Sequence, residues 1–313
     1  MRPLIAGRDP LGAIRELGAA RLPFYAAGTR VVGVAEMSNV IAAVDELATE
    51  PAAGAAGTVL VRLETRLGRL VLGEGILEAE IAGALRDPEA RRAILVSEPG
   101  AWAAVGERLS SQLGAAGFGV ERVLLPQGED AKRLSVIEDA ANELARLRVE
   151  RREPIIAVGG GALGDAAGFL AATYLRGIPF IQVPTTLVAQ IDSSIGGKTG
   201  VDLAAGKNLL GAFHQPAAIV IDIAVLATLE AEGRAIAVGD PSAVESGALA
   251  EVVERAARAK VEVVVADERE SGARLSLNLG HSLGHAIEAA AGFAGLLHGE
   301  AVAYGLRAAA RIG

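Results

Sequence analysis

Short apolar runs alternate with longer amphipathic stretches through the middle of the chain. Stretches with helical spacing, such as Glu138–Leu147 and Asp165–Leu175, separate runs rich in β-branched residues. Six such runs predict strands, at Thr58–Leu63, Ala93–Ser97, Val120–Leu125, Pro154–Val158, Pro179–Val183 and Ala218–Asp222. Strands that alternate with helices form right-handed βαβ units. The pattern therefore predicts an α/β fold with a mostly parallel sheet.

The pattern differs on either side of this α/β region. Residues 1–48 are predicted to form a small unit, and the small residues, Pro and Gly of 49–57 predict a flexible linker. We expect the α/β domain at 58–228 and an all-helical domain at 229–313, because no strand pattern follows Leu229. The helices predicted there are Glu245–Ala266, Asn278–Ala291 and Gly299–Ile312.

Composition excludes several classes of protein. The sequence has no apolar run of about 18 residues, which predicts that no segment spans a membrane. It has no cysteine, so neither disulfides nor thiolate chemistry are expected, and we expect a cytoplasmic protein. The net charge of −8 argues against a general nucleic-acid binder, which would present a basic surface.

Lysine is rare and clustered in this chain. Only four of the 30 basic residues are lysines, and all lie in stretches that contain candidate chemistry. A chain that uses arginine for its surface charge has reason to keep lysine where a compact ammonium group is needed. The lysines are Lys132, Lys198, Lys207 and Lys260.

A glycine loop follows the apolar run at 154–158. Gly159, Gly161 and Gly164 have the spacing G-x-G-x-x-G between a predicted strand and a predicted helix. Glycines there allow the backbone to approach a pyrophosphate at the helix N-terminus, although a tight packing turn has the same pattern. No acidic residue ends the next strand to bind a ribose, and Asp165 within the loop is a candidate replacement.

The stretch after the next strand is rich in groups that bind phosphates or polyhydroxylated ligands. It combines Thr185 and Thr186 with the runs Gln190–Ser194, Gly196–Gly200 and Gly206–Asn208. Gly-Gly-Lys-Thr resembles the end of a Walker A loop. However, Ser194 stands where the first glycine of that motif belongs, which argues against a P-loop NTPase.

Three of the four histidines lie within a short C-terminal stretch. His281, His285 and Glu288 have the spacing of one helix face, and His298-Gly-Glu300 follows a short loop. This pattern favours a divalent metal or proton-transfer site over a set of ordinary core histidines.

Together these motifs resemble the 3-dehydroquinate synthase family over residues 58–313. The motifs that carry the resemblance are Gly128–Lys132, Gly159–Asp165, Ala171–Gly177, Gln182–Thr186, Asp192–Ser194, Gly196–Gly200, Gly206–Asn208, Phe213–Gln215, Asn278–His281 and Leu297–Glu300. The resemblance implies an NAD-binding α/β domain followed by a helical, metal-binding domain, with the active site between them. It also implies a homodimer.

The resemblance assigns roles to individual residues. The substrate, a seven-carbon keto-acid phosphate, would be held by Lys198, Lys207, Asn208, Arg176, Asp192, Lys260, Arg274, Asn278 and His285. NAD would contact Gly128, Glu129, Lys132, Gly159, Gly160, Gly161, Gly164, Asp165, Thr185, Thr186, Lys198, Lys207, Thr228 and Leu229. His281 and His298 would bind zinc or cobalt.

The implied reaction begins with transient oxidation of a ring hydroxyl by NAD. Phosphate elimination, re-reduction, ring opening and an aldol closure follow, so NAD is regenerated as a true cofactor. In this scheme a divalent metal polarises the hydroxyl that is oxidised.

The first 48 residues resemble a different enzyme, the C-terminal part of shikimate kinase. Arg2–Ile5 resembles its lid, and Arg21–Tyr25 resembles its substrate-binding element. No complete Walker A loop precedes them, so no kinase activity is expected. The combination indicates a fragment of a bifunctional kinase–synthase.

The sequence departs from the synthase pattern in three places. The segment that supplies the third metal ligand, Gly-Leu-Ala-Glu-Val-x-Lys, is missing after Leu229; Asp240 and Glu251 are candidate replacements without support from register. The helical domain ends within a pattern at Arg311–Gly313, as if cut short, and Asp202 stands where the family more often has Asn. We therefore expect NAD binding to survive better than turnover.

Three alternatives remain open on the sequence alone. A related metal-dependent polyol or alcohol dehydrogenase would share the glycine loop and the histidines but would release NADH. A sugar-phosphate cyclase with another substrate would share nearly all the residues. An inactive fragment that binds NAD at most is the third.

Overall fold

The computed structural model describes residues 57–85, 92–228, 248–290 and 298–312. By their internal contacts these residues fall into two compact units, 57–261 and 262–312, and each is described by itself. The predicted unit at 1–48 and the linker up to residue 56 lie outside the described residues. The domain boundary predicted at 228/229 adjoins the undescribed segment 229–247 and stays a prediction. None of the described helices is long and apolar enough to cross a membrane.

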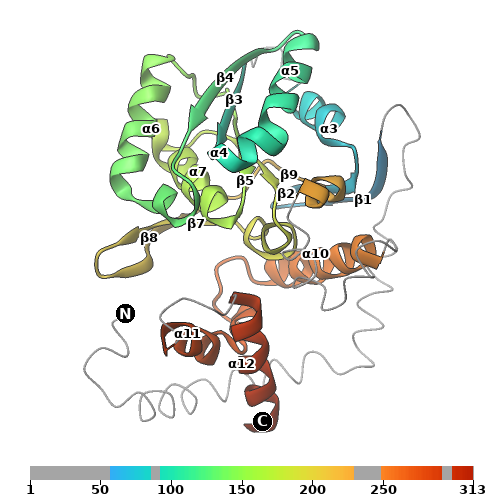
Figure 1. Ribbon diagram of the computed structural model, residues 1–313, viewed down its shortest axis with the longest axis vertical. Helices are drawn as coiled ribbons and strands as arrows, with labels where there is room; N and C mark the ends of the chain where they lie inside the picture. The colour runs from blue at the N-terminus through green and yellow to red at the C-terminus, as the bar shows by residue number, and fades with distance from the viewer. Residues whose placement is uncertain (1–56, 86–91, 229–247, 291–297, 313) are drawn as a thin grey trace. The chain divides into compact units, whose positions relative to one another are not determined.

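The first unit is built on a seven-stranded sheet (Figure 1). β1 is antiparallel to β2 at one edge, and every other neighbouring pair is parallel. In spatial order the strands are β1 (Thr58–Thr65), β2 (Gly68–Glu74), β9 (Ala218–Asp222), β6 (Phe180–Pro184), β5 (Ile155–Gly159), β3 (Arg92–Ser97) and β4 (Gly119–Leu124). The α/β fold and mostly parallel sheet that the sequence predicts are confirmed, although β2 was not foreseen.

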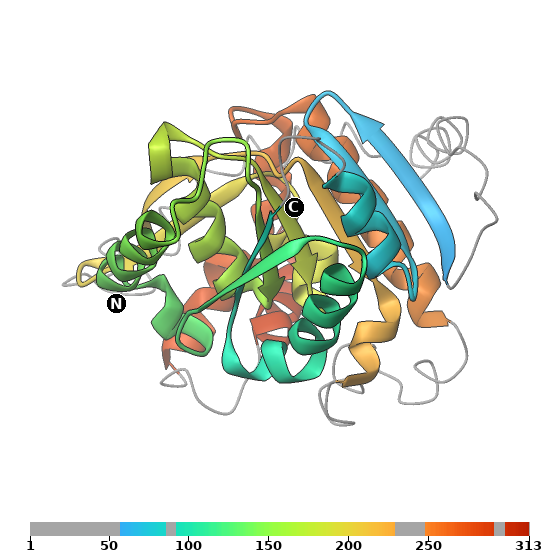
Figure 2. The same ribbon diagram turned by 90° about the horizontal axis from the view of Figure 1, so that it is seen from above.

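Helices cover both faces of this sheet (Figures 1 and 2). α6 (Leu134–Arg146) and α7 (Gly161–Thr173) pack against one face. α3 (Leu77–Ala84) and α5 (Glu107–Ala115) pack against the other. Neighbouring residues of β3 and β5 point into opposite clusters, which explains why these strands are written as continuous apolar runs.

Several elements of this unit were not foreseen. β7 (Lys198–Leu203) and β8 (Gly206–Phe213) form a separate antiparallel hairpin. Two turns have π-helical hydrogen bonding, a geometry that is frequent at functional sites. The short elements are α4 (Pro99–Ala101), the π turns η1 (Trp102–Gly106) and η4 (Ala189–Ser193), and the 3₁₀ turns η2 (Gly128–Lys132), η3 (Tyr174–Arg176) and η5 (Ile223–Thr228).

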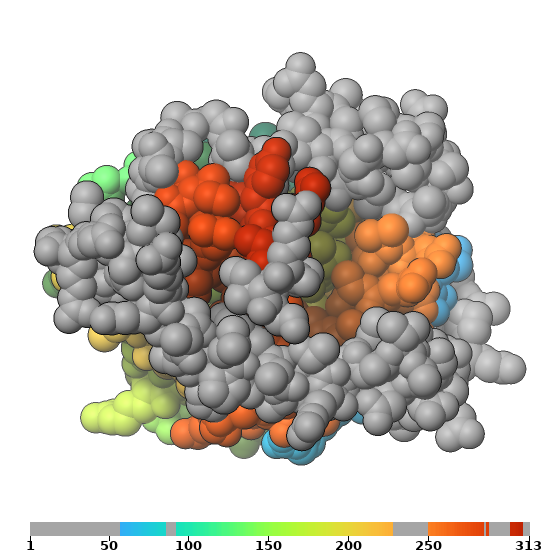
Figure 3. Space-filling view, turned by 90° about the horizontal axis from the view of Figure 1, so that it is seen from below, coloured from blue at the N-terminus to red at the C-terminus, as the bar shows by residue number. Residues whose placement is uncertain are grey.

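The described chain after residue 247 is helical, as predicted. It comprises α10 (Ala248–Ala266), η6 (Ala273–Asn278), α11 (His281–Ala290) and α12 (His298–Ile312). Several residues of α10 are exposed, and this helix appears in orange in Figure 3. α11 and α12 pack closely: a Cβ at Gly280 would lie 2.6 Å from the Leu306 amide nitrogen, and the φ of +78° at Gly280 favours glycine.

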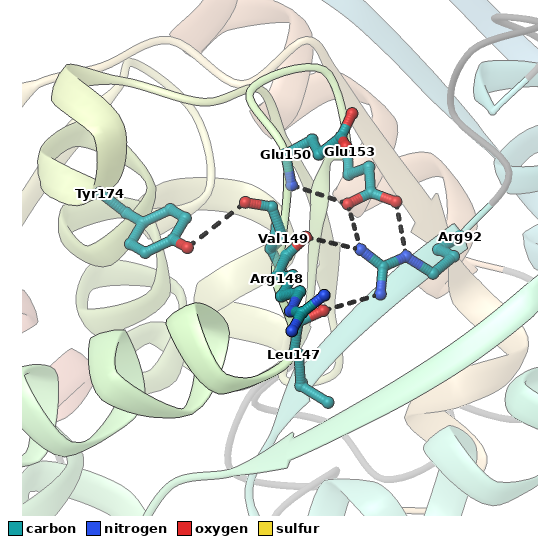
Figure 4. Close-up of polar contacts among 7 residues, drawn as sticks. All are labelled: Arg92, Leu147, Arg148, Val149, Glu150, Glu153 and Tyr174. Carbon is teal, nitrogen blue, oxygen red and sulfur yellow. Dashed lines mark hydrogen bonds and ion pairs between the residues drawn. The ribbon is translucent and has the colours of Figure 1, made fainter.

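A guanidinium clamp closes the amino-terminal edge of the parallel sheet (Figure 4). Arg92, the first residue of β3, donates to both carboxylate oxygens of Glu153 at 2.6 Å. Its guanidinium also donates to the carbonyls of Leu147 and Arg148, at 2.9 and 3.0 Å. Burial opposes ionisation of Glu153, but the hydrogen bond and charge of Arg92 together with the hydrogen bond from the Glu150 amide outweigh it and lower the pKa of that carboxyl.

We expect Arg92→Met to lower the free energy of unfolding by about 1–3 kcal/mol, because it removes the charged donor of two carbonyls and leaves the buried Glu153 carboxylate with only the Glu150 amide. Arg146→Met is the matched control, since the Arg146–Glu143 pair lies in solvent and should contribute nothing measurable. Urea unfolding measures both. Equal losses in the two variants would contradict the role of the clamp.

Candidate active site

The candidate cofactor residues gather at the carboxyl edge of the parallel strands. From β3 the chain continues outward to β4, whereas from β5 it continues in the opposite direction to β6. Such a change of direction leaves a crevice between the carboxyl ends of the two strands, which is where α/β sheets bind ligands. In this sheet the direction changes between β3 and β5, so we expect the ligand crevice there.

The glycine loop forms one wall of this crevice. Gly159 ends β5, Gly160 precedes α7, and no side chain caps the helix. The first amides of a helix have no partner within it and favour an anion. A Cβ at Gly161 would lie 2.7 Å from the Ser193 Oγ, so a side chain there would displace the π turn η4. The Ser193 hydroxyl itself is buried and has no hydrogen-bond partner among the described residues.

Glu98 is an acidic residue of this crevice that the sequence analysis missed. It directly follows β3, and only 5% of it is exposed. Its carboxylate accepts the Gly128 amide at 2.7 Å and the Gly160 amide at 3.2 Å, which joins the two loops that were expected to contact NAD. The missing acid was sought after the strand that follows the glycine loop. Glu98 stands instead after β3, which neighbours β5 in the sheet and precedes the glycine loop in sequence. The run Ser-Glu-Pro-Gly at the end of that strand could have indicated it.

The buried ammonium group of Lys132 links two further candidates. Lys132, 3% exposed, donates to Asp165 at 2.7 Å and also to the side-chain oxygen of Asn208. Burial raises the pKa of the Asp165 carboxyl, and the Lys132 charge partly counteracts that rise. Asn208 has a φ of +57°, which asparagine tolerates better than most residues. The backbone amide of Asn208 donates to the side-chain oxygen of Asp202 at 2.8 Å. Either Asp or Asn at position 202 can accept this hydrogen bond.

Lys207 and Glu129 meet at the rim of this cluster. Their charged groups are 3.3 Å apart, and 56% of each side chain is exposed. An exposed pair of this kind contributes little to stability, so both side chains can reorient toward a ligand.

The segment after β6 brings two threonines and an ion pair to the same edge. The Thr185 amide donates to the Gly159 carbonyl at 3.0 Å, and the Thr186 side chain lies beside Gly160. The π turn that follows carries Asp192, whose carboxylate pairs with Lys260 of α10. The side chain of Lys260 is 12% exposed, and its ammonium also donates to the Asp192 carbonyl.

Two of the predicted substrate residues lie away from this cluster. Arg176 is exposed on the turn before β6, and the Leu175 carbonyl accepts from Arg151, so this turn lies at the amino-terminal edge of the sheet. Lys198 begins β7, next to Gly197, whose carbonyl accepts the amide of His214. It lies about 13 Å along that strand from Asp202, which faces the Lys132 region.

In the second unit, a loop after α10 organises the next candidates. Arg274 is 2% exposed, and its guanidinium donates to the Glu268 carbonyl. Asn278 donates to the Glu270 carboxylate at 2.8 Å. Glu270 was missed by the sequence analysis. Its φ of +58° is strained for a glutamate, and such strain concentrates at functional sites.

The described residues do not complete a metal site. No group of three His, Asp or Glu side chains suited to a metal occurs among them. His281 begins α11 after the tight turn at Gly280, and its Nδ1 lies 3.4 Å from the Leu279 carbonyl. The side chains of His285, His298 and Thr228, and the whole of Asp240 and Leu229, lie outside the described part of the chain. Glu251 is described: it is exposed on α10 and 3.4 Å from Arg255.

The family follows from comparison with known proteins. A family model described as 3-dehydroquinate synthase N-terminal matches residues 122–235, and the corresponding C-terminal model matches residues 216–313. The 3-dehydroquinate synthase of Symbiobacterium thermophilum is 45% identical over 267 residues, which are 78% of this chain and 74% of that protein. The chain belongs to the 3-dehydroquinate synthase family. These enzymes are NAD- and metal-dependent lyases of the shikimate pathway.

Solved structures of related cyclases share the fold. A 2-epi-5-epi-valiolone synthase from Streptomyces hygroscopicus with NAD⁺ and Zn²⁺ bound is 30% identical, with a TM-score of 0.67 over 78% of this chain and 74% of that chain. A 2-deoxy-scyllo-inosose synthase complexed with carbaglucose-6-phosphate, NAD⁺ and Co²⁺ is 28% identical, with a TM-score of 0.66 over 76% of this chain and 72% of that chain.

We expect Lys132→Met to destabilise the protein by about 2–3 kcal/mol at neutral pH, because the Asp165 carboxylate then loses its buried counter-charge. The double variant Lys132→Met, Asp165→Asn should recover part of this loss. Burial favours the protonated form of Asp165, so the deficit of the single variant should shrink as the pH is lowered. Urea unfolding at pH 8 and pH 5 measures it, and a deficit that grows on acidification would refute this explanation.

The stability contribution of Asp267 should also depend on pH, but in a more acidic range. Hydrogen bonds, the largest from the Ser271 amide, lower the pKa of Asp267 from 3.8 to about 2. Its stabilising contribution is therefore complete above pH ~4 and is lost as the pH falls toward 2. The difference in urea midpoint between the wild-type protein and Asp267→Asn should narrow over that interval. A constant difference would show that ionisation of Asp267 is unimportant.

Proposed function

We propose that this chain converts a seven-carbon keto-acid phosphate (DAHP) into 3-dehydroquinate and phosphate. The observation that carries the proposal is the cluster of Lys132, Asp165 and Asn208 beside an uncapped helix N-terminus. The greater identity to a 3-dehydroquinate synthase than to the two other cyclases favours this substrate over those of related enzymes.

The crevice fits the phosphates of NAD. The uncapped start of α7, the close approach at Gly161 and the unpartnered Ser193 hydroxyl provide donors for a pyrophosphate. Glu98 supplies a carboxylate that suits a ribose hydroxyl, a role usually filled by an acid after the next strand. NAD, when bound, would supply the transient oxidation of the substrate's ring hydroxyl. The remaining NAD contacts are proposed as the resemblance assigns them, namely Gly128, Glu129, Lys132, Gly159, Gly160, Gly164, Asp165, Thr185, Thr186, Lys198, Lys207, Thr228 and Leu229.

The substrate needs cations for its phosphate and carboxylate and acceptors for its hydroxyls. Ammonium and guanidinium groups hold a leaving phosphate and stabilise the charge that it gains. Asp192, held by Lys260, offers an oriented carboxylate to a substrate hydroxyl. We assign this binding to residues that the resemblance implies, Lys207, Asn208, Asp192, Lys260, Arg274, Asn278 and His285. Arg176 and Lys198, which the resemblance also implies, lie away from the Lys132 cluster within this chain, so we do not assign them a substrate contact from it.

Glu270 adds a carboxylate to this set. It accepts a hydrogen bond from the side chain of Asn278, to which the resemblance assigns a substrate contact, so Glu270 would help to orient that side chain.

We propose His281 and His298 as ligands of a divalent metal. Imidazoles are suitable ligands for zinc and cobalt, and those metals accompany NAD⁺ in the two related cyclases. The third ligand stays unassigned. Glu251 is a poor candidate in the observed conformation, because it faces solvent beside Arg255.

Two further assignments rest on resemblance alone. We propose that residues 1–48 derive from the end of a shikimate kinase, and that the protein forms a homodimer. Sedimentation of the full chain tests the second assignment directly.

Phosphate release from the keto-acid phosphate tests the proposed function. With NAD and Zn²⁺ or Co²⁺, we expect phosphate and 3-dehydroquinate in equal amounts and no net NADH, because the cofactor is regenerated. A chelator should abolish release. Net NADH from simple polyols would instead favour a dehydrogenase, and absence of both products would indicate an inactive NAD-binding chain.

A further inference from the structure

The carboxylate of Asp267 folds the segment that follows α10. Its Oδ1 accepts the amide and the hydroxyl of Ser271, at 2.9 and 3.1 Å. Its Oδ2 accepts the amides of Gly272 and Arg274, at 2.7 and 3.0 Å. A negative charge directly after a helix is unfavourable, because it meets the negative end of the helix dipole. The helix therefore does not explain this aspartate, whereas the four hydrogen bonds do.

The folded segment in turn holds two side chains to which the proposed function assigns substrate contacts. The Glu268 carbonyl accepts from the Arg274 guanidinium, and the Glu270 carboxylate accepts from Asn278. Glu270 keeps a positive φ of 58°, a conformation that costs free energy unless its surroundings impose it. The bonds between Asp267 and residues on the far side of Glu270 impose that conformation, so both contacts depend on one carboxylate.

We propose that Asp267 is a positioning residue for substrate binding, acting through the backbone to orient Arg274 and Asn278. The proposal rests on the proposed function, because the roles of these two residues do. Both oxygens of Asp267 are occupied by the loop, so Asp267 itself does not contact the substrate. Its effect should therefore disappear when the two side chains that it positions are removed.

The first experiment measures binding without turnover in the NAD- and metal-loaded enzyme. The probe is a phosphonate analogue of the substrate, in which a methylene group replaces the bridging oxygen so that phosphate cannot leave. In Asp267→Asn an NH₂ group replaces one oxygen that accepts two hydrogen bonds, and we expect the analogue to bind about tenfold more weakly. The affinity for NAD should stay within about twofold of wild type, since the NAD contacts lie in the other unit.

A double-mutant cycle separates positioning from a general structural role. In a background that carries both Arg274→Ala and Asn278→Ala, Asp267→Asn should change the affinity for the analogue by less than about twofold, because both positioned side chains are already absent. Ser271→Ala, which removes only the 3.1 Å bond, is a milder second variant should Asp267→Asn fold poorly. It should weaken analogue binding by about two- to threefold and leave NAD binding unchanged.

The results of these binding experiments distinguish failure of the positioning role from failure of the proposed function. Equal losses from Asp267→Asn in both backgrounds, a parallel loss of NAD affinity, or unchanged analogue binding in both Asp267→Asn and Ser271→Ala would each overturn the positioning role. If the wild-type enzyme neither binds the analogue nor releases phosphate, the proposed function fails and this proposal with it. If the wild-type enzyme binds and the variants bind equally well, only this proposal fails.

Discussion

The buried ammonium of Lys132 is the contact on which the cofactor side of the molecule depends. It joins the turn η2, the helix α7 and the hairpin strand β8, through Asp165 and Asn208. An unpaired charge at that depth would be costly, so the pair holds all three elements in one arrangement. The glycine loop is consequently fixed between this ion pair on one side and the Glu98 carboxylate on the other. Hydrogen bonds and ion pairs between the residues expected to contact NAD therefore hold these residues in place.

In the second unit, hydrogen bonds to a single aspartate, Asp267, hold the candidate residues in place. Its candidate substrate residues lie on a loop, where no sheet edge fixes their direction. One aspartate supplies four hydrogen bonds to that loop and so gives it the definition that a strand end gives to the glycine loop. A reaction with several steps on one substrate needs such fixed groups, since small displacements are costly to the rate.

The sequence predicted the central strands well because they are buried on both faces and therefore apolar without interruption. It missed β2 and the β7–β8 hairpin, whose residues are mixed in polarity and include glycines. The residues around Lys132 were candidates from the sequence, but only the fold shows that Lys132 is buried and that its ammonium contacts Asp165 and Asn208. The position of Arg176 could not be predicted, since its motif does not indicate that it lies at the amino-terminal edge of the sheet.

Glu98 and Glu270 were missed for a common reason. Each is a single acidic residue outside a recognisable spacing, and each becomes a candidate only through the contact that it makes in three dimensions. The metal ligands mark the other limit, because a ligand set distributed over several elements cannot be assembled from one motif. His281 and His298 therefore stay assignments by resemblance.

The central claim is that the NAD site is complete within the α/β unit and does not require the metal. Calorimetric titration of the chelator-treated protein with NAD tests it most directly. The account predicts saturable binding to one site per chain, with an affinity that added Zn²⁺ leaves unchanged. No detectable binding at ~1 mM NAD, or binding that appears only after metal is restored, would contradict it.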